Sequence, residues 1–237
     1  MIRHAKHEVD MPIVASGLTR EYRQGEVVVH ALRGLDISFG AAEFTALVGP
    51  SGSGKSTLLN LLGCLDSPTS GSIQISGRDV VGLSRSESAQ FRLQHIGFVF
   101  QAYNLIPVLT AYENAEYTLL LRGVPKPERM ERVTALLERV GLADMMHRRP
   151  HELSGGQQQR VAVVRAIAAR PTFVLADEPT ANLDSQTSAE LLDLMYELNA
   201  ENGVTFLFAS HDPLVVQRAT RVVRLLDGKM VDDESRT

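Results

Sequence analysis

Residues 49–57 combine glycines, serines and one lysine in a single short stretch. They read GPSGSGKST and fit the pattern G-x-x-x-x-G-K-[ST]. Glycines at these positions let the backbone curl so that successive N–H groups point at phosphate oxygens. A lysine ammonium at this position reaches the β- and γ-phosphates, and the serine hydroxyl after it is a Mg²⁺ ligand. The stretch therefore predicts a triphosphate site made of Gly49, Pro50, Ser51, Gly52, Ser53, Gly54, Lys55, Ser56 and Thr57.

Two adjacent carboxylates, Asp177 and Glu178, follow the apolar run 173–176. In an open α/β sheet, ligands bind at the carboxyl ends of the strands. Asp177 is therefore expected to help hold Mg²⁺, and Glu178 to act as general base toward an attacking water. Alone, two acids after a strand are equally well explained as solvated loop charges. The loop at 49–57 favours the catalytic interpretation.

A mostly parallel sheet has to position these groups. The apolar run 44–48 before the glycine-rich loop is typical of a buried strand, and residues 56–62 after it favour a helix. Apolar runs at 96–100, 172–176 and 204–209 predict further strands of the same sheet. Alternating or β-rich segments at 13–22, 26–32, 35–39 and 71–77 predict an antiparallel β subdomain near the N-terminus.

Between residues 109 and 149 the pattern changes from α/β to helical, with helices expected at 111–122 and 128–140. The fold class we expect is α/β: a P-loop NTPase core with a RecA-like, mostly parallel sheet, an antiparallel β subdomain and an inserted helical subdomain. Further helices are expected at 84–94, 157–170, 185–201 and 213–219. The strands of a closing hairpin are expected at 221–226 and 229–231.

The expected domain spans residues 12–233 and follows a flexible tail at 1–11. Its α/β core covers about 12–100 and 159–233, and its helical subdomain about 101–158.

Composition restricts the function classes further. No run approaches the ~20 apolar residues that cross a bilayer, and the N-terminus has no apolar segment of a secretory leader. The net charge of −4 gives no sign of a nucleic-acid partner, and a lone Cys64 excludes an internal disulfide framework.

The segment LSGGQ at 153–157 sets this chain apart from other P-loop proteins. Ser154 suits a helix N-cap, and two glycines after it expose backbone N–H groups, which makes a second anion site without a lysine. A plain capped helix start is the alternative. On this segment the chain resembles the ATP-binding-cassette (ABC) ATPases, whose signature is LSGGQ, and the resemblance covers residues 13–231.

The resemblance implies roles that the residue types alone do not. Tyr22 resembles the aromatic that stacks on adenine, and His211 the switch histidine that contacts the γ-phosphate. Gln101 resembles the Q-loop glutamine that senses Mg²⁺ and water. Without the resemblance these three would be a packed tyrosine, a capping residue and a solvated loop residue. The implied catalytic residues are Glu178, His211, Lys55 and Gln101; the implied metal ligands are Ser56, Gln101 and Asp177; and the ATP contacts gain Ser154, Gly155, Gly156, Gln157 and Asp184.

The resemblance also implies partners. In the family each ATP, with Mg²⁺, is closed by the signature of a second copy, so a head-to-tail homodimer is expected. Segments 65–71, 104–114 and 175–184 resemble a bacterial branch with lipoprotein-releasing, macrolide-exporting and cell-division ATPases; Ala181 and the segment 208–210 depart from it. That branch implies a Mg-dependent ATPase coupled to a separate membrane permease, peripheral at the cytoplasmic face of the inner membrane.

Two alternatives stay open. A soluble cassette acting on nucleic acid or ribosomes usually carries two cassettes or a coiled coil, and neither is present in this sequence. A nucleotide-binding module without turnover is disfavoured by the intact set Lys55, Asp177, Glu178 and His211.

Overall fold

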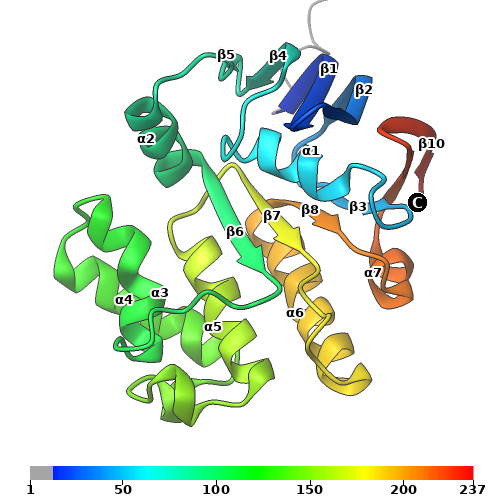
Figure 1. Ribbon diagram of the computed structural model, residues 1–237. Helices are drawn as coiled ribbons and strands as arrows, with labels where there is room; N and C mark the ends of the chain where they lie inside the picture. The colour runs from blue at the N-terminus through cyan, green and yellow to red at the C-terminus, as the bar shows by residue number, and fades with distance from the viewer. Residues whose placement is uncertain (1–12, 237) are drawn as a thin grey trace, which may run out of the picture.

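The protein is described by a computed structural model that covers residues 13–236 and contains two sheets (Figure 1). The expected tail at 1–11 lies outside the described residues. Six strands form the larger sheet, in the order β10-β9-β3-β8-β7-β6. Its members are β3 (Phe44–Val48), β6 (Ile96–Phe100), β7 (Phe173–Asp177), β8 (Thr205–Ala209), β9 (Arg221–Leu226) and β10 (Lys229–Ser235). All neighbouring pairs are parallel except β10 with β9, which confirms the expected α/β class.

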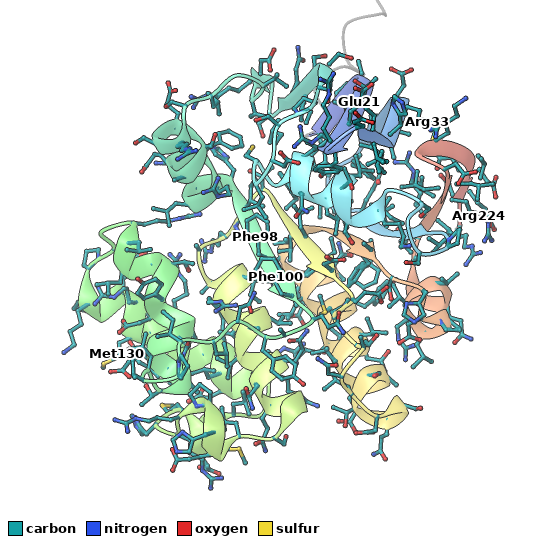
Figure 2. All side chains as sticks on the ribbon, in the orientation of Figure 1. Glu21, Arg33, Phe98, Phe100, Met130 and Arg224 are labelled. Atoms are coloured by element: carbon teal, nitrogen blue, oxygen red, sulfur yellow. The ribbon has the colours of Figure 1, made fainter. Side chains whose placement is uncertain are left out.

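The parallel register brings the functional loops to one edge. Phe100 pairs with Asp177, Asp177 with Ala209, and Leu47 with Ala209. The loops that follow β3, β6, β7 and β8 therefore leave the sheet side by side. β6 is the last strand of the sheet, where Phe98 and Phe100 stack ring to ring with centroids 5.5 Å apart (Figure 2).

Helices and the second sheet cover both faces of the large sheet. Alternate residues of β8 face opposite ways: Phe206 and Phe208 enter one hydrophobic core, and Leu207 and Ala209 the other. This explains why β3, β7 and β8 in the middle of the sheet are mostly apolar, because neither face of these strands meets water. The helices are α1 (Lys55–Leu62), α2 (Arg85–His95), α3 (Ala111–Leu121), α4 (Lys126–Arg139), α5 (Gly155–Ala168), α6 (Ser185–Asn202) and α7 (Pro213–Arg218), with short 3₁₀ turns η1 (Ala143–Met145) and η2 (Pro150–Glu152).

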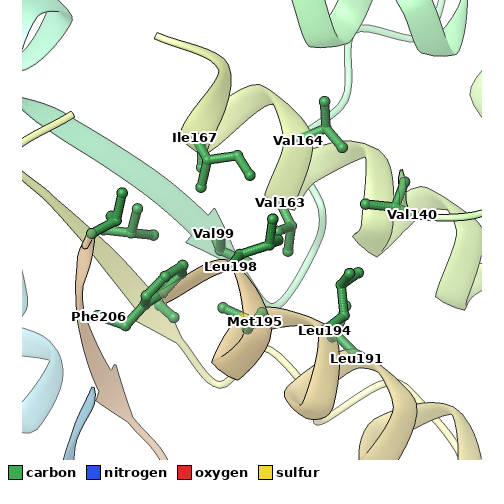
Figure 3. Packing of buried hydrophobic residues seen from close by; sticks show 14 of the residues in the cluster. Val99, Val140, Val163, Val164, Ile167, Leu191, Leu194, Met195, Leu198 and Phe206 are labelled. Carbon is green, nitrogen blue, oxygen red and sulfur yellow. The ribbon is translucent and has the colours of Figure 1, made fainter. Parts of the chain in front are cut away.

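The first core lies between the sheet, α5 and α6. Figure 3 shows Val163 and Ile167 of α5 facing Leu194 and Leu198 of α6, with Phe206 of β8 beside them. All five side chains are buried. Removing a core side chain of this kind typically costs about 2–5 kcal/mol. This packing fixes the start of α5 relative to the loops at the carboxyl edge of the sheet.

The smaller sheet is antiparallel, in the order β2-β1-β4-β5, and its members are β1 (Ile13–Gln24), β2 (Val27–Phe39), β4 (Ser70–Ile75) and β5 (Arg78–Asp79). The sequence predicted two strands at 26–32 and 35–39, and the structure has one. Gly34 is an extra residue between the pairs Leu18–Leu35 and Thr19–Arg33, with φ +75°. A glycine bulge of this kind bends a strand without ending it.

The inserted helices α3 and α4 pack on α5. Arg122 at the end of α3 donates to the carbonyl oxygens of Leu93, Gln94 and Ala169, which ties the insertion to the last turn of α2 and to the end of α5. The expected subdomain boundary near residue 158 falls inside α5, so this helix belongs to both parts. β10 extends to Ser235, beyond the expected end at 233. Within residues 13–236, no helix combines the length and apolarity needed to cross a bilayer.

Candidate functional site

The glycine-rich loop connects the buried strand β3 to α1, as the sequence predicted. α1 begins at Lys55, and its N-cap Gly54 is left-handed with φ +105° and no side-chain cap. A Cβ at position 49 would lie 2.2 Å from the carbonyl oxygen of Leu225, and one at position 54 would lie 2.7 Å from that of Ala31. Only glycine fits either position. The uncapped N-terminus of α1 leaves backbone N–H groups and the helix dipole for an anion.

Lys55 and Ser53 supply the polar side chains of this loop. The Lys55 ammonium lies over the loop and donates to the carbonyl oxygens of Gly49 and Pro50, at 2.8 and 3.0 Å. Ser53 is buried, and its hydroxyl has no hydrogen-bond partner in the described part of the chain. The backbone oxygen of Ser53 accepts from Gly228 in the β9–β10 turn, which supports the loop from behind. These groups fit a triphosphate, whose oxygens accept from a lysine ammonium and from backbone N–H groups.

Ser56 and Asp177 form a pair of oxygen donors suited to Mg²⁺. The Ser56 hydroxyl donates to Oδ1 of Asp177 at 3.1 Å. Neighbouring ligands of an octahedral Mg²⁺ lie about 2.9 Å apart, since each is about 2.0–2.1 Å from the ion. Burial raises the pKa of Asp177, and the Glu178 charge adds to this, while the Ser56 hydrogen bond and Lys55 oppose it. A divalent cation at this place would favour the ionised carboxylate.

Glu178 has a strained backbone conformation, and hydrogen bonds to its backbone and side chain hold it in place. Its φ is +46°, a left-handed conformation that costs of order 1–3 kcal/mol for a residue with a side chain. Its backbone N–H donates to the Ala209 oxygen, and its carboxylate accepts from the Ser210 hydroxyl at 2.9 Å. The other carboxylate oxygen lies 2.8 Å from Nδ1 of His211, whose side chain is 78% exposed. The geometry holds an acid and an imidazole together beside the Ser56–Asp177 pair.

Gln101 and Tyr22 lie on the borders of this cluster. Gln101 directly follows β6, and its backbone oxygen accepts from the Asn182 side chain at 2.9 Å. Tyr22 on β1 donates its hydroxyl to Asp66 at 2.9 Å, with the Arg20 guanidinium 4.6 Å from its ring centroid. These contacts fix the position of the Gln101 backbone and of the Tyr22 side chain. Their assigned roles stay predictions.

The signature segment lies apart from the glycine-rich loop of its own chain. Ser154 is the N-cap of α5 and exchanges hydrogen bonds with Gln157 in a capping box. A Cβ at Gly155 would lie 2.7 Å from the Tyr103 hydroxyl, and one at Gly156 would lie 2.4 Å from the Thr187 side chain. The glycines therefore allow close packing as well as access to the backbone. In Figure 1, α5 lies with the helical insertion, away from α1.

Asp184 is the N-cap of α6. Its carboxylate accepts from the backbone N–H and the hydroxyl of Thr187, at 2.9 and 2.6 Å, and these bonds lower its pKa. Because Thr187 also packs on Gly156, both Asp184 and the signature segment contact this residue. The structure thus groups Ser154, Gly155, Gly156, Gln157 and Asp184 in a second cluster, distinct from that of Lys55, Ser56, Asp177, Glu178 and His211.

Several residues of these clusters had no assigned role in the sequence interpretation. Ser210 bonds to Glu178, and Thr180 donates to Asp212 directly after His211, at 2.7 Å. Gln159 is buried within α5 between two loops of the site. The place of Ser210 directly before His211 was a usable signal. Nothing in the sequence pattern marks Gln159, because its partners are backbone oxygens distant in the chain.

Comparison with known proteins places these motifs in a family. Residues 32–181 match the family model described as ABC transporter. The chain is 49% identical to the lipoprotein-releasing system ATP-binding protein LolD of Anaeromyxobacter dehalogenans, over 92% of both chains. It is 47% identical to the macrolide export ATP-binding/permease protein MacB of Rhodopseudomonas palustris, over 94% of this chain and 34% of that protein. The chain spans about a third of the length of that relative.

A solved structure supports the same placement. A dimeric, post-hydrolysis structure of the ATP-binding cassette MJ0796, bound to ADP and Pi, matches with a TM-score of 0.87 and 39% identity. The match covers 95% of this chain and 99% of the other. At 39% identity the two proteins are similar in sequence as well as in fold.

Proposed function

The chain belongs to the ABC transporter family of ATPases, and from that premise we propose that two copies close head to tail around two Mg-ATP and drive a separate membrane permease. The observation that carries the hydrolytic part is the convergence of three strand ends. Ser56 meets Asp177 at 3.1 Å, and Glu178 meets His211 at 2.8 Å, at one edge of the sheet. Such a cluster can bind the nucleotide phosphates, and can orient and activate a water molecule next to them.

In the proposed reaction each group has one task. The N–H groups of the loop and Lys55 bind the phosphates and stabilise the negative charge that develops during phosphoryl transfer to water. Ser56 and Asp177 would hold Mg²⁺, which would supply positive charge near the phosphate oxygens. Glu178 accepts a proton from the attacking water, and His211 orients the water and the terminal phosphate. Ser210 keeps the Glu178 carboxylate in position through its 2.9 Å hydrogen bond.

The head-to-tail arrangement is supported by the different phosphate-binding groups that the two clusters carry. The glycine-rich loop carries the lysine, and the capped start of α5 offers backbone N–H groups without one. Among the described residues, the side chains nearest to a Cβ placed at Gly155 or Gly156 are those of Tyr103, Leu183 and Thr187, and none belongs to the glycine-rich loop. A second copy, turned to present its α5 start to the bound triphosphate, completes the site. The terminal phosphate adds contacts on both sides, so ATP favours the closed pair over ADP.

The permease is supported by the relatives and by one surface. MacB relatives are named as combined ATP-binding and permease proteins, and this chain spans the length of an ATP-binding part. A groove of about 200 Å³ lies beside β6, with Phe98, Phe100, Thr118 and Arg165 in its lining. Its lining includes Phe100, which directly precedes Gln101, and we propose that the membrane subunit contacts the chain at this groove. We place the protein at the cytoplasmic face of the inner membrane, with no nucleic-acid partner. Relatives from transport systems favour this over the soluble alternative.

The test uses Glu178→Gln, which removes the proton acceptor and keeps the shape of the side chain. We expect the variant to bind Mg-ATP, to release phosphate at least about a hundredfold more slowly, and to accumulate as a dimer. Light scattering after gel filtration measures the mass, and a phosphate assay measures turnover. Lys55→Ala in the same background is the control, because it removes a phosphate contact and should leave a monomer.

Two results would contradict the proposal. Turnover of Glu178→Gln at the wild-type rate would show that another group accepts the proton. A Glu178→Gln protein that stays monomeric in saturating Mg-ATP, while binding it, would remove the head-to-tail arrangement. Co-purification of the wild-type chain with a polytopic membrane protein from solubilised membranes tests the permease separately; recovery of ribosomes or nucleic acid instead would favour the alternative.

A further inference from the structure

Gln159 is a buried amide at the junction of the two clusters. It lies in the second turn of α5, the helix that begins at the signature segment, and its side chain is fully buried. Its Nε2 donates to the carbonyl oxygen of Pro179 at 2.8 Å and to that of Phe100 at 3.3 Å. Pro179 directly follows Glu178, and Phe100 directly precedes Gln101. One amide group therefore bonds to the backbone beside the proton acceptor and beside the Q-loop glutamine.

A packing role alone does not explain an amide at this place. Oε1 of Gln159 is buried and has no hydrogen-bond partner among residues 13–236. A buried polar atom without a partner costs free energy. An apolar side chain of the same length would remove that cost but would leave the two carbonyl oxygens without the amide donors. The residue is explained by its NH₂ group, whose two hydrogens match the two oxygens.

The surrounding bonds extend the same link. Asn182 donates to the Gln101 oxygen from the loop after β7, at 2.9 Å. From α5, Arg165 donates to the oxygens of Tyr103 and Asn104, which are both left-handed with φ +59° and +50°. α5 is thus bonded to the last residue of β6, Phe100, and to two carbonyl oxygens of the loop that follows it, those of Tyr103 and Asn104. Gln159 alone among these groups joins α5 to both loops.

We propose that Gln159 is a positioning residue for ATP hydrolysis, which sets the backbone of Glu178 and Gln101 relative to the signature helix. The inference rests on the hydrolysis proposed above. Gln159 touches no reacting group, so its effect passes through the two loops. We expect it to affect turnover more than the affinity of a single chain for nucleotide, because the phosphate-binding loop is supported by Gly228, whose N–H donates to the Ser53 oxygen, and by the Ala31 oxygen beside Gly54, and neither belongs to α5. Misplacement of a catalytic group by about 1 Å costs on the order of a hundredfold in rate.

The experiment replaces Gln159 by methionine, which keeps its length and removes both donors. In the full chain we expect kcat for Mg-ATP to fall on the order of tenfold to a hundredfold, while the Kd for Mg-ATP binding stays within about twofold. Gln159→Leu also removes both donors without adding a charge, so it should give the same loss and serves if the methionine variant is poorly soluble.

A matched control separates positioning from stability. Asn199 is another buried amide that donates to backbone oxygens, those of Ala42 and Val204 at 2.9 and 2.7 Å, and these lie outside both clusters. Asn199→Leu should lower the thermal midpoint and keep wild-type kcat. Wild-type kcat in both Gln159 variants, or an equal loss of kcat in Asn199→Leu, would overturn the inference. A wild-type chain that binds Mg-ATP without turnover would instead overturn the proposed function, and this inference with it.

Discussion

At the residue scale, the hydrogen bond from Ser210 to Glu178 makes a separate prediction. Ser210 is fully buried, and its hydroxyl donates to the carboxylate and accepts from the Asp212 backbone N–H, at 2.9 and 3.1 Å. Ser210→Ala removes both bonds. Because the carboxylate is then less well oriented, we expect kcat to fall about tenfold, which equals about 1.4 kcal/mol. Steady-state phosphate release, together with equilibrium nucleotide binding, measures the change.

The conservative variant tests the chemical cause. Ser210→Thr keeps the hydroxyl on the same carbon and adds one methyl group, so it should retain kcat within about threefold. If the alanine and threonine variants lose activity equally, packing and not the hydroxyl is the cause. If the alanine variant keeps wild-type kcat, the carboxylate is held by His211 and its own backbone alone.

At the element scale, the ion pair between β9 and β10 links stability to pH. Arg221 of β9 donates to Asp233 of β10 and also to Glu43 and the Ser38 oxygen. The Arg221 hydrogen bond lowers the pKa of Asp233 below its unfolded value of about 3.9. A lowered pKa stabilises the fold above that unfolded value, and the contribution is lost as the pH falls through the folded value. At pH 7, Asp233→Asn should therefore cost about 1 kcal/mol in unfolding free energy.

Urea unfolding at several pH values checks this, with the neighbouring residue as control. The Asp232–Arg224 pair also joins the two strands, but its side chains are 53% and 48% exposed. Asp232→Asn should change stability by no more than a few tenths of a kcal/mol. The difference between wild type and Asp233→Asn should shrink below about pH 4. A difference that stays constant down to pH 2.5 would show that charge is not its origin.

The elements also show what the sequence can predict. The strand before the glycine-rich loop and the N-cap Ser154 depend on nearby residues, and each expected helix begins within about two residues of its place. The bulge at Gly34 was missed because a glycine in a β-rich segment marks a break or a bulge equally well. Only the pairing partner on β1 decides between them.

For the site, the motifs predicted that Ser56 and Asp177 meet, because parallel strands end at one edge, and the resemblance implied His211 beside the γ-phosphate; the Glu178–His211 contact itself comes from the structure. The supporting bonds of Gln159 were not predictable. They join a side chain to backbone oxygens 20 and 59 residues away, and any residue type offers such an oxygen. Long-range side-chain to backbone bonds leave no trace in residue spacing.

At the scale of the whole molecule, the proposed pair of chains requires that the N-terminal end of helix α5 in one copy faces the triphosphate bound to the other copy. Ser154→Asp tests this without disturbing the helix, because aspartate caps as well as serine. In the closed pair the added carboxylate would face the partner's γ-phosphate, and the two negative charges repel. We therefore expect wild-type affinity of the single chain for Mg-ATP, with both dimer formation and turnover lost.

Ser84→Asp is the matched control, because Ser84 caps α2 with the same kind of capping box and lies in neither cluster. In the Glu178→Gln background, Ser84→Asp should dimerise with ATP as its parent does, and Ser154→Asp should remain single in light scattering. Exposed charges are screened by salt, so partial recovery of the Ser154→Asp dimer in about 0.5 M salt would identify repulsion as the cause. Full dimerisation of Ser154→Asp at low salt would mean that the start of α5 does not face the partner's nucleotide, and the pair would need another geometry.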